Sequence, residues 1–333
     1  MSRATLGKKE RIELLETMLR MRMFEERMLK EIKSGNLEIG FHLLEGHEAT
    51  VAGVCASLRT TDYVTSNHRS LGRYLSRGGD MNKLMAEIFG KATGMSRGKA
   101  GEMLFSDFSV GHAFTSVTVG AGIPVAVGIA MAIKLRMKTD QVAVAFFGDA
   151  ATTNASFHES LNLASVQKAP VVFVCENDGL SINVPQTEYQ STRTVAEKGA
   201  AYGIEGLFVD GTDPEAVRRT AIHAVKKARN GKGPTLIDAQ VVRLRPHKEG
   251  MGDTRSEEEL AASRRRDPVL RYTRLLSKEG VVTEQQERKI RREIEGQIDK
   301  AVDFARTSPF PGTSEIFKDL YSDEMNLLFH YLR

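Results

Sequence analysis

Two apolar segments of this chain each run into an aspartate, and this pair constrains the fold more than any other feature. Residues 142–147 and 170–175 are typical of buried β-strands, and they lead into Asp149 and Asp178. Residues 157–168 between them have helical spacing of apolar side chains, so the unit is strand–helix–strand. Strands joined in this way are parallel, and we expect both aspartates at the same edge of one sheet.

The paired aspartates indicate a site for a cation and a phosphate group. Carboxylate oxygens are the ligands that Mg²⁺ and Ca²⁺ prefer in proteins. A single aspartate at a strand end is more often a turn or a helix cap, so the prediction depends on the pair. The sequence therefore predicts a metal ion that holds a phosphate-bearing cofactor at the carboxyl edge of the sheet.

The rest of the chain predicts an α/β fold with a mainly parallel sheet flanked by helices and with helical N- and C-terminal extensions. We expect helices at 10–32, 81–89, 214–228 and after a capping box at Thr283, and strands at 63–66, 207–209 and 235–242. Residues 93–114 are glycine-rich and predict irregular structure. We expect a single domain over 1–333, with a helical arm at about 7–60, an α/β core at 61–245, a mobile loop at 247–267 and a helical tail at 268–333.

Composition excludes several classes of protein. The chain has 333 residues, a net charge of +4 and two cysteines inside apolar segments. The charge is too small and too dispersed to predict a nucleic-acid partner, and no segment predicts a signal peptide or a membrane span. We expect Cys55 and Cys175 to be buried thiols. We expect a cytoplasmic protein with neither a nucleic-acid nor a membrane partner.

Two further strand ends have polar residues that suit phosphate chemistry and proton transfer. Arg69 follows the strand at 63–66, and its planar guanidinium suits bidentate contact with phosphate. His42 and His247 are candidates for proton transfer, because imidazole titrates near neutral pH. The alternatives are a structural role for His42, a surface ion pair for Arg69 and no role for His247. A dinucleotide-binding loop at 120–122 is disfavoured, because Val125 stands where a third glycine is needed.

The residues resemble one family, the alpha subunits of thiamine-diphosphate-dependent 2-oxo acid dehydrogenases. These are the decarboxylating components of pyruvate, branched-chain and acetoin dehydrogenase complexes. The family signature is Gly-Asp-Gly followed by Asn-Asn, and this chain has Gly148-Asp149-Ala150 and then Asn177-Asp178. Segments in the family's order lie at 40–49, 67–78, 98–103, 119–124, 232–234, 267–269 and 305–309. The resemblance implies the thiamine diphosphate-binding fold.

The resemblance also implies roles for individual residues. The Mg²⁺ ligands would be the side chains of Asp149 and Asp178 and the backbone carbonyl of Leu180. Arg69 would anchor the diphosphate with His68 beside it, and Val119 would pack near the aminopyrimidine ring. The catalytic residues would be His42, His247 and His68. The full cofactor-binding set would be Arg69, His68, Val117, Val119, Gly148, Asp149, Ala150, Ala151, Asp178, Leu180 and His247.

The implied reaction is decarboxylation of a 2-oxo acid, or cleavage of acetoin, with transfer of the acyl group to a lipoyl arm. A beta subunit would supply the glutamate that the cofactor needs, in an α2β2 heterotetramer, and a lipoyl acyltransferase would accept the product. Four departures from the family pattern stand at Leu71, Ala150, Asp178 and Pro246. The alternatives are a two-component thiamine-dependent carboligase or acyltransferase, and a degenerate subunit that only stabilises its partner.

Overall fold

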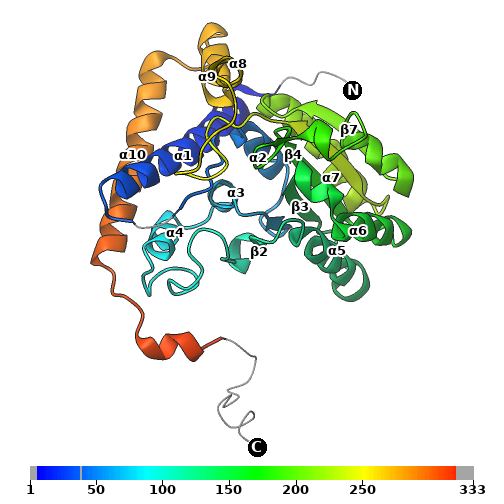
Figure 1. Cartoon of the computed structure of the whole chain (residues 1–333), viewed down its shortest axis with the longest axis horizontal. Helices are drawn as coiled ribbons and strands as arrows, with labels where there is room; N and C mark the ends of the chain where they lie inside the picture. The colour runs from blue at the N-terminus through cyan, green and yellow to red at the C-terminus, as the bar shows by residue number, and fades with distance from the viewer. Residues whose placement is uncertain (1–5, 38–39, 320–333) are drawn as a thin grey trace, which may run out of the picture.

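The structure, a computed structural model, describes residues 6–37 and 40–319, and a six-stranded parallel sheet lies at its centre (Figure 1). The strand order is β2-β1-β3-β4-β8-β7, and every neighbouring pair is parallel. The strands are β1 (Tyr63–Ser66), β2 (His112–Thr115), β3 (Ala143–Gly148), β4 (Val171–Asn177), β7 (Glu205–Asp210) and β8 (Thr235–Gln240). A separate two-stranded hairpin consists of β5 (Leu180–Ser181) and β6 (Val184–Pro185).

Helices cover both faces of the sheet, as the sequence predicted. The longer helices are α1 (Lys8–Lys33), α2 (Glu48–Cys55), α3 (Leu71–Ser76), α4 (Met81–Ile88), α5 (Gly122–Ala132), α6 (Ala155–Val166), α7 (Pro214–Arg229), α8 (Glu257–Arg265), α9 (Pro268–Lys278) and α10 (Glu284–Thr307). Helices α5 and α6 pack in one hydrophobic core, whereas α1–α4, α7, α9 and α10 contribute to the other. The mainly parallel α/β fold is therefore confirmed.

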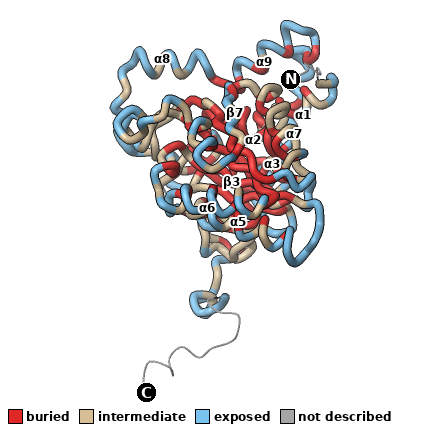
Figure 2. The backbone as a smooth tube through the Cα atoms, turned by 90° about the vertical axis from the view of Figure 1, so that its right-hand side faces the viewer, coloured by how far each residue is buried: buried red, intermediate tan, exposed pale blue. Residues whose placement is uncertain are grey.

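Strand β3 shows why the sheet is buried on both sides. Val144 and Phe146 point into the core on one face, and Ala145 and Phe147 point into the core on the other. Such a strand reads as a continuous apolar run, because a parallel sheet covered by helices has no solvated face. Figure 2 shows the same arrangement as a buried centre surrounded by exposed outer segments.

The predicted helix boundaries follow from local capping. The Asp213 side chain accepts hydrogen bonds from two backbone amides in the first turn of α7, and Thr283 and Gln286 form the capping box of α10. The apolar residues Ile290, Ile294, Ile298 and Val302 of α10 are buried, and this helix packs along α1 and α4. Cys55 and Cys175 are buried free thiols, as predicted.

Two segments differ from the sequence prediction. Strand β2 lies within the stretch that we expected to be irregular, because His112 and Thr115 give it no apolar signature although both are buried. Helix α8 lies within the stretch expected to be a mobile loop; Ser256 caps it, but none of its residues is buried. A solvent-exposed helix of this kind has no apolar periodicity to reveal it. None of the described helices combines the length and apolar character that a membrane span needs.

Candidate functional site

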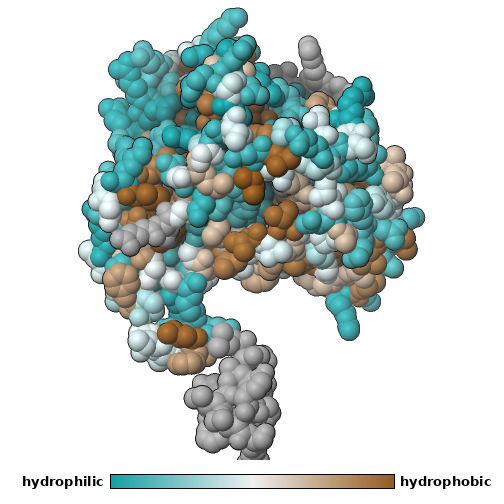
Figure 3. All heavy atoms as spheres, in the orientation of Figure 1, coloured by the Kyte–Doolittle hydropathy of each residue, from teal (hydrophilic) through white to brown (hydrophobic). Residues whose placement is uncertain are grey.

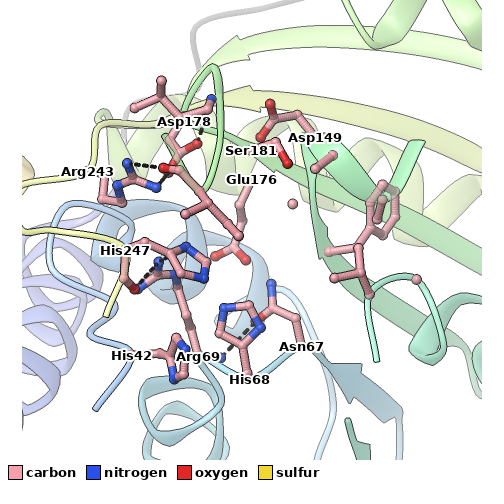
Figure 4. A pocket seen from close by; sticks show the side chains of 18 of the residues that line it. His42, Asn67, His68, Arg69, Asp149, Glu176, Asp178, Ser181, Arg243 and His247 are labelled. Atoms are coloured by element: carbon pink, nitrogen blue, oxygen red, sulfur yellow. Dashed lines mark hydrogen bonds and ion pairs between the residues drawn. The ribbon is translucent and has the colours of Figure 1, made fainter. Parts of the chain in front are cut away.

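The predicted site residues all line one cavity at the carboxyl edge of the sheet. Its volume is about 540 Å³, and it is formed by segments that follow β1, β3, β4 and β8 (Figure 4). The predicted residues that line it are His42, His68, Arg69, Val117, Val119, Gly148, Asp149, Ala150, Ala151, Asp178, Leu180 and His247. The convergence follows from the parallel direction of these strands. Asp149 and Asp178 lie in one part of the cavity, and the three histidines lie in another.

Asp149 is the buried acid of the site. It follows β3 at the start of a 3-10 turn, it is 2% exposed, and its carboxylate accepts a hydrogen bond from the Tyr189 hydroxyl. Burial, and secondarily the nearby negative charge of Asp178, raise the pKa of Asp149 to about 7. The protein alone therefore stabilises the neutral form of this acid, and a bound cation would favour the ionised form.

Asp178 lies in a tight turn after β4. Its Oδ1 accepts a hydrogen bond of 3.0 Å from the backbone N–H of Leu180, and its Oδ2 lies 3.6 Å from Nη1 of Arg243. Gly179 between them has φ = 77°, a conformation that glycine adopts at no steric cost. The turn places the backbone of Leu180 beside the Asp178 carboxylate. Two of the three predicted metal ligands, Asp178 and Leu180, therefore come from one short segment.

Arg69 holds two distant segments of the chain together. Its Nη1 donates to the carbonyl of Leu43, and its Nη2 donates to the carbonyl of His247 at 3.0 Å. Burial lowers the pKa of this guanidinium to about 10, so it stays charged at neutral pH. A guanidinium has five N–H groups, and those not bound to these carbonyls leave Arg69 able to contact an anion in the cavity. It is therefore not the surface ion pair considered as an alternative.

Three histidines from separate parts of the chain converge on one point. One ring nitrogen each of His42, His68 and His247 lies within 4.8 Å of the others. Burial and the charge of Arg69 lower the pKa of His68 well below its usual value and that of His247 to about 4, so both are neutral at pH 7. A neutral imidazole has one donor and one acceptor nitrogen, which suits hydrogen bonding to a substrate carbonyl or hydroxyl.

The sequence analysis missed several residues of the site. Glu102 Oε1 lies 3.2 Å from Nδ1 of His42, and this contact orients the imidazole. Tyr189 and Arg243 contact the two aspartates, as described above. Arg243 lies shortly after β8 and could have been found by the strand-end argument. Glu102 lies in the family-like segment 98–103, but neither Glu102 nor Tyr189 stands at the end of a strand of the main sheet.

A buried charge network lies under the cavity. The Glu176 side chain accepts from Arg73, whose guanidinium is fully buried and stacks 4.9 Å from the centre of the Phe146 ring. The other oxygen of Glu176 has no hydrogen-bond partner among the described residues, nor has Nε2 of His68. Buried polar atoms of this kind normally have a hydrogen-bond partner, so we expect a polar ligand in the cavity to be that partner.

Comparison with known proteins gives the family. The sequence profile of the dehydrogenase E1 component family matches residues 16–314. The chain is 37% identical to the alpha subunit of acetoin:2,6-dichlorophenolindophenol oxidoreductase of Bacillus subtilis over 95% of each chain. This chain belongs to the dehydrogenase E1 component family. It is also 36% identical to a chloroplastic pyruvate dehydrogenase E1 alpha subunit of Arabidopsis thaliana, over 96% of this chain and 76% of the relative. Identity to the 2-oxoisovalerate dehydrogenase alpha subunit of Bacillus subtilis is 31%, over 95% and 97% of the two chains.

Membership of the E1 family confirms the resemblance that the sequence motifs indicated. The chain is an alpha subunit of a thiamine-diphosphate-dependent E1 dehydrogenase, and such a subunit has a beta subunit as its partner. The E1 match begins within α1 and ends after α10, so it spans the sheet and the helices on both sides of it in the sequence.

Proposed function

We propose that this chain binds the diphosphate of thiamine diphosphate through a Mg²⁺ ion and decarboxylates a 2-oxo acid, or cleaves acetoin, together with its beta subunit. The observation that carries the proposal is the single cavity lined by two strand-end aspartates, a buried arginine and three histidines. Carboxylates suit the cation, and the arginine suits the phosphate. The acyl group would pass to the lipoyl arm of an acyltransferase component.

The donor set suits a hard divalent cation. The ligands would be one oxygen each of Asp149 and Asp178 and the backbone carbonyl of Leu180. Mg²⁺ usually binds to one or two carboxylates together with phosphate oxygens and water, and this cavity offers that combination. Arg69 would orient the diphosphate, with Gly148, Ala150 and Ala151 along the β3 end. A Cβ at Gly148 would meet no atom within 4 Å, so open space remains above this backbone.

When bound, thiamine diphosphate supplies a nucleophilic carbon that adds to the substrate carbonyl. His68 and His247 would bind and orient the oxygen of that carbonyl by hydrogen bonds from ring N–H groups, and His42 would exchange a proton with the substrate. Nδ1–H of His42 donates to Glu102, so its Nε2 is left to accept a proton and then to return it. Val117 and Val119, which are 44% and 48% exposed, would pack against the cofactor rings.

The partners follow from the chemistry that the family resemblance implies. Thiamine chemistry needs an acid at the aminopyrimidine ring, which the beta subunit would supply in an α2β2 heterotetramer. Apolar patches gather near the middle of the face shown in Figure 3, and exposed apolar side chains in this chain include Ile182 and Val184 beside the cavity. Such surface is typical of a chain that meets another. The cytoplasmic location, the single domain and the mobility of residues 247–267 remain predictions.

The test is binding of thiamine diphosphate by this chain coexpressed with its beta subunit. Calorimetry in the presence of Mg²⁺ should show saturable binding that a chelator abolishes. Lipoamide-dependent reduction of NAD⁺ in the reconstituted complex then separates a dehydrogenase from a carboligase. Absence of cofactor binding by the purified pair would leave only the degenerate subunit as an interpretation.

A further inference from the structure

One guanidinium group faces the carboxylate of Asp178. The Oδ2 atom of Asp178 lies 3.6 Å from Nη1 of Arg243, and the two side chains are 8% and 2% exposed (Figure 4). A buried charge without a partner is strongly destabilising, and Arg243 gives the Asp178 carboxylate a partner of opposite charge. The sequence analysis singled out Asp178 as a carboxylate where the family usually has a neutral amide.

Arg243 is fixed in this position by its surroundings. Its Nη2 donates a hydrogen bond of 2.6 Å to the carbonyl of Ile182, in the hairpin that follows Asp178. Its own carbonyl accepts from Arg255, which is paired with Asp253. The hydrogen bond to Ile182 therefore holds the guanidinium beside Asp178, and the contact with Arg255 holds the backbone of Arg243.

The charges in the cavity explain why such a residue is needed. Asp149 and Asp178 line the same cavity, and a diphosphate would bring further negative charge to the same place. Two carboxylates attract a cation, but they repel a diphosphate. Arg69 brings a single positive charge to this cavity, which is less than the negative charge that two carboxylates and a diphosphate would bring.

We propose that Arg243 is a positioning residue that offsets the negative charge of Asp178, so that the cavity binds a divalent cation and a diphosphate together although it has two aspartates. The proposal rests on the proposed function of this cavity. Arg243 acts on the metal through Asp178, and its charge also favours the diphosphate.

Loss of the arginine should have opposite effects on the two ligands. In Arg243→Gln, Asp178 loses its cation, so the affinity for Mn²⁺ without cofactor should rise several-fold. The affinity for thiamine diphosphate at saturating Mg²⁺ should fall by about tenfold or more, because an unpaired buried charge would face the diphosphate. A residue that only supported the fold would weaken binding of both ligands.

The experiment is a double-mutant cycle on the full chain coexpressed with its beta subunit, with Mn²⁺ measured by electron paramagnetic resonance and thiamine diphosphate by calorimetry. Asp178→Asn combined with Arg243→Gln should restore cofactor affinity to within about threefold of the wild type, because the charges again balance. Arg243→Lys should retain most of the wild-type affinity for thiamine diphosphate. Arg245→Gln is the matched control, because Arg245 lies in the same segment but pairs with Glu45.

Each outcome decides the proposal. Equal loss of both affinities in Arg243→Gln, or no rescue in the double variant, would overturn it while leaving the proposed function intact. Asp178→Asn alone gives an independent test if Arg243→Gln fails to fold. This variant should weaken Mn²⁺ binding without weakening the binding of thiamine diphosphate. A wild-type pair that binds neither Mn²⁺ nor thiamine diphosphate would refute the proposed function itself.

Discussion

The two parts of the cavity are assembled in different ways. The acidic part contains Asp149 and Asp178, which come from adjacent parallel strands joined by a single helix. The histidine part contains His42, His68 and His247, which lie on three separate loops, and His247 is far in sequence from the other two. Local sequence is enough to build the acidic part, because one strand–helix–strand unit places both aspartates. The histidine part depends on long-range contacts such as those of Arg69.

The two parts also differ in how burial changes their charge. Burial raises the pKa of Asp149 and lowers that of His247, so each group is favoured in its neutral form. A bound cation would therefore favour the ionised form of Asp149, whereas a neutral histidine is already able to donate and accept hydrogen bonds. We therefore expect the acidic part to control cofactor binding and the histidine part to control turnover.

The largest effect should come from the acidic part. Asp149→Ala removes the buried carboxylate that would bind the metal, and we expect metal-dependent affinity for thiamine diphosphate to fall by about 100-fold or more, as for loss of a charged partner in a buried site. Calorimetry of the coexpressed pair measures this. Asp140→Ala is the control, since Asp140 is an exposed acid paired with Arg59. Unchanged affinity in Asp149→Ala would exclude this residue as a ligand.

The histidine part should show the reverse pattern. His42→Asn should lower kcat by about 100-fold or more, the range for loss of a general acid or base, with little change in cofactor affinity. Glu102→Gln should have a smaller effect of about tenfold, because the amide oxygen can still accept from Nδ1 of His42. Steady-state kinetics beside calorimetry separates the two quantities. A matching loss of cofactor affinity in His42→Asn would contradict the division of roles.

Acidification should change the contributions of His247 and Asp149 to the free energy of unfolding in opposite directions. The folded pKa of His247 is about 4 and lies below the unfolded value of 6.5, so its contribution to the free energy of unfolding falls as pH drops from about 6.5 to 4. The folded pKa of Asp149 is about 7 and lies above the ordinary aspartate value of 3.8, so its contribution to the free energy of unfolding rises as pH drops through 7. We expect effects of about 1 kcal/mol each, since one pKa unit corresponds to about 1.4 kcal/mol and solvent reduces it.

Urea unfolding at pH 7 and pH 5 without metal measures these slopes. In His247→Asn the destabilising contribution at pH 5 should disappear, whereas in Asp149→Asn the stabilising contribution should disappear. The two variants should therefore shift the difference between pH 7 and pH 5 in opposite directions. Shifts of the same sign would show that burial does not act on these groups as described.

The smallest effect should lie outside the cavity, in the segment 248–267. If the cofactor orders this segment, its protease sensitivity should fall severalfold when thiamine diphosphate and Mg²⁺ bind, because local opening becomes less favourable. Limited proteolysis of the coexpressed pair with and without cofactor measures this. Equal cleavage rates in both conditions would mean that α8 and its flanks are not coupled to the site.

The sequence by itself determined the parallel sheet, its helical layers and the meeting of the strand-end residues. Apolar runs with short crossovers allow few arrangements, and parallel direction alone brings Arg69, Asp149 and Asp178 to one edge. Motif order then identified the family, which the match over residues 16–314 confirms.

Only the tertiary structure decided which side chains hold these residues in place. Tyr189 on Asp149, Arg243 beside Asp178 and Glu102 under His42 are contacts between segments far apart in sequence, and no local pattern encodes them. Strand β2 and helix α8 were missed for a related reason, since neither has an apolar periodicity. Local patterns report burial and backbone geometry, whereas the pairing of charges depends on how distant segments pack.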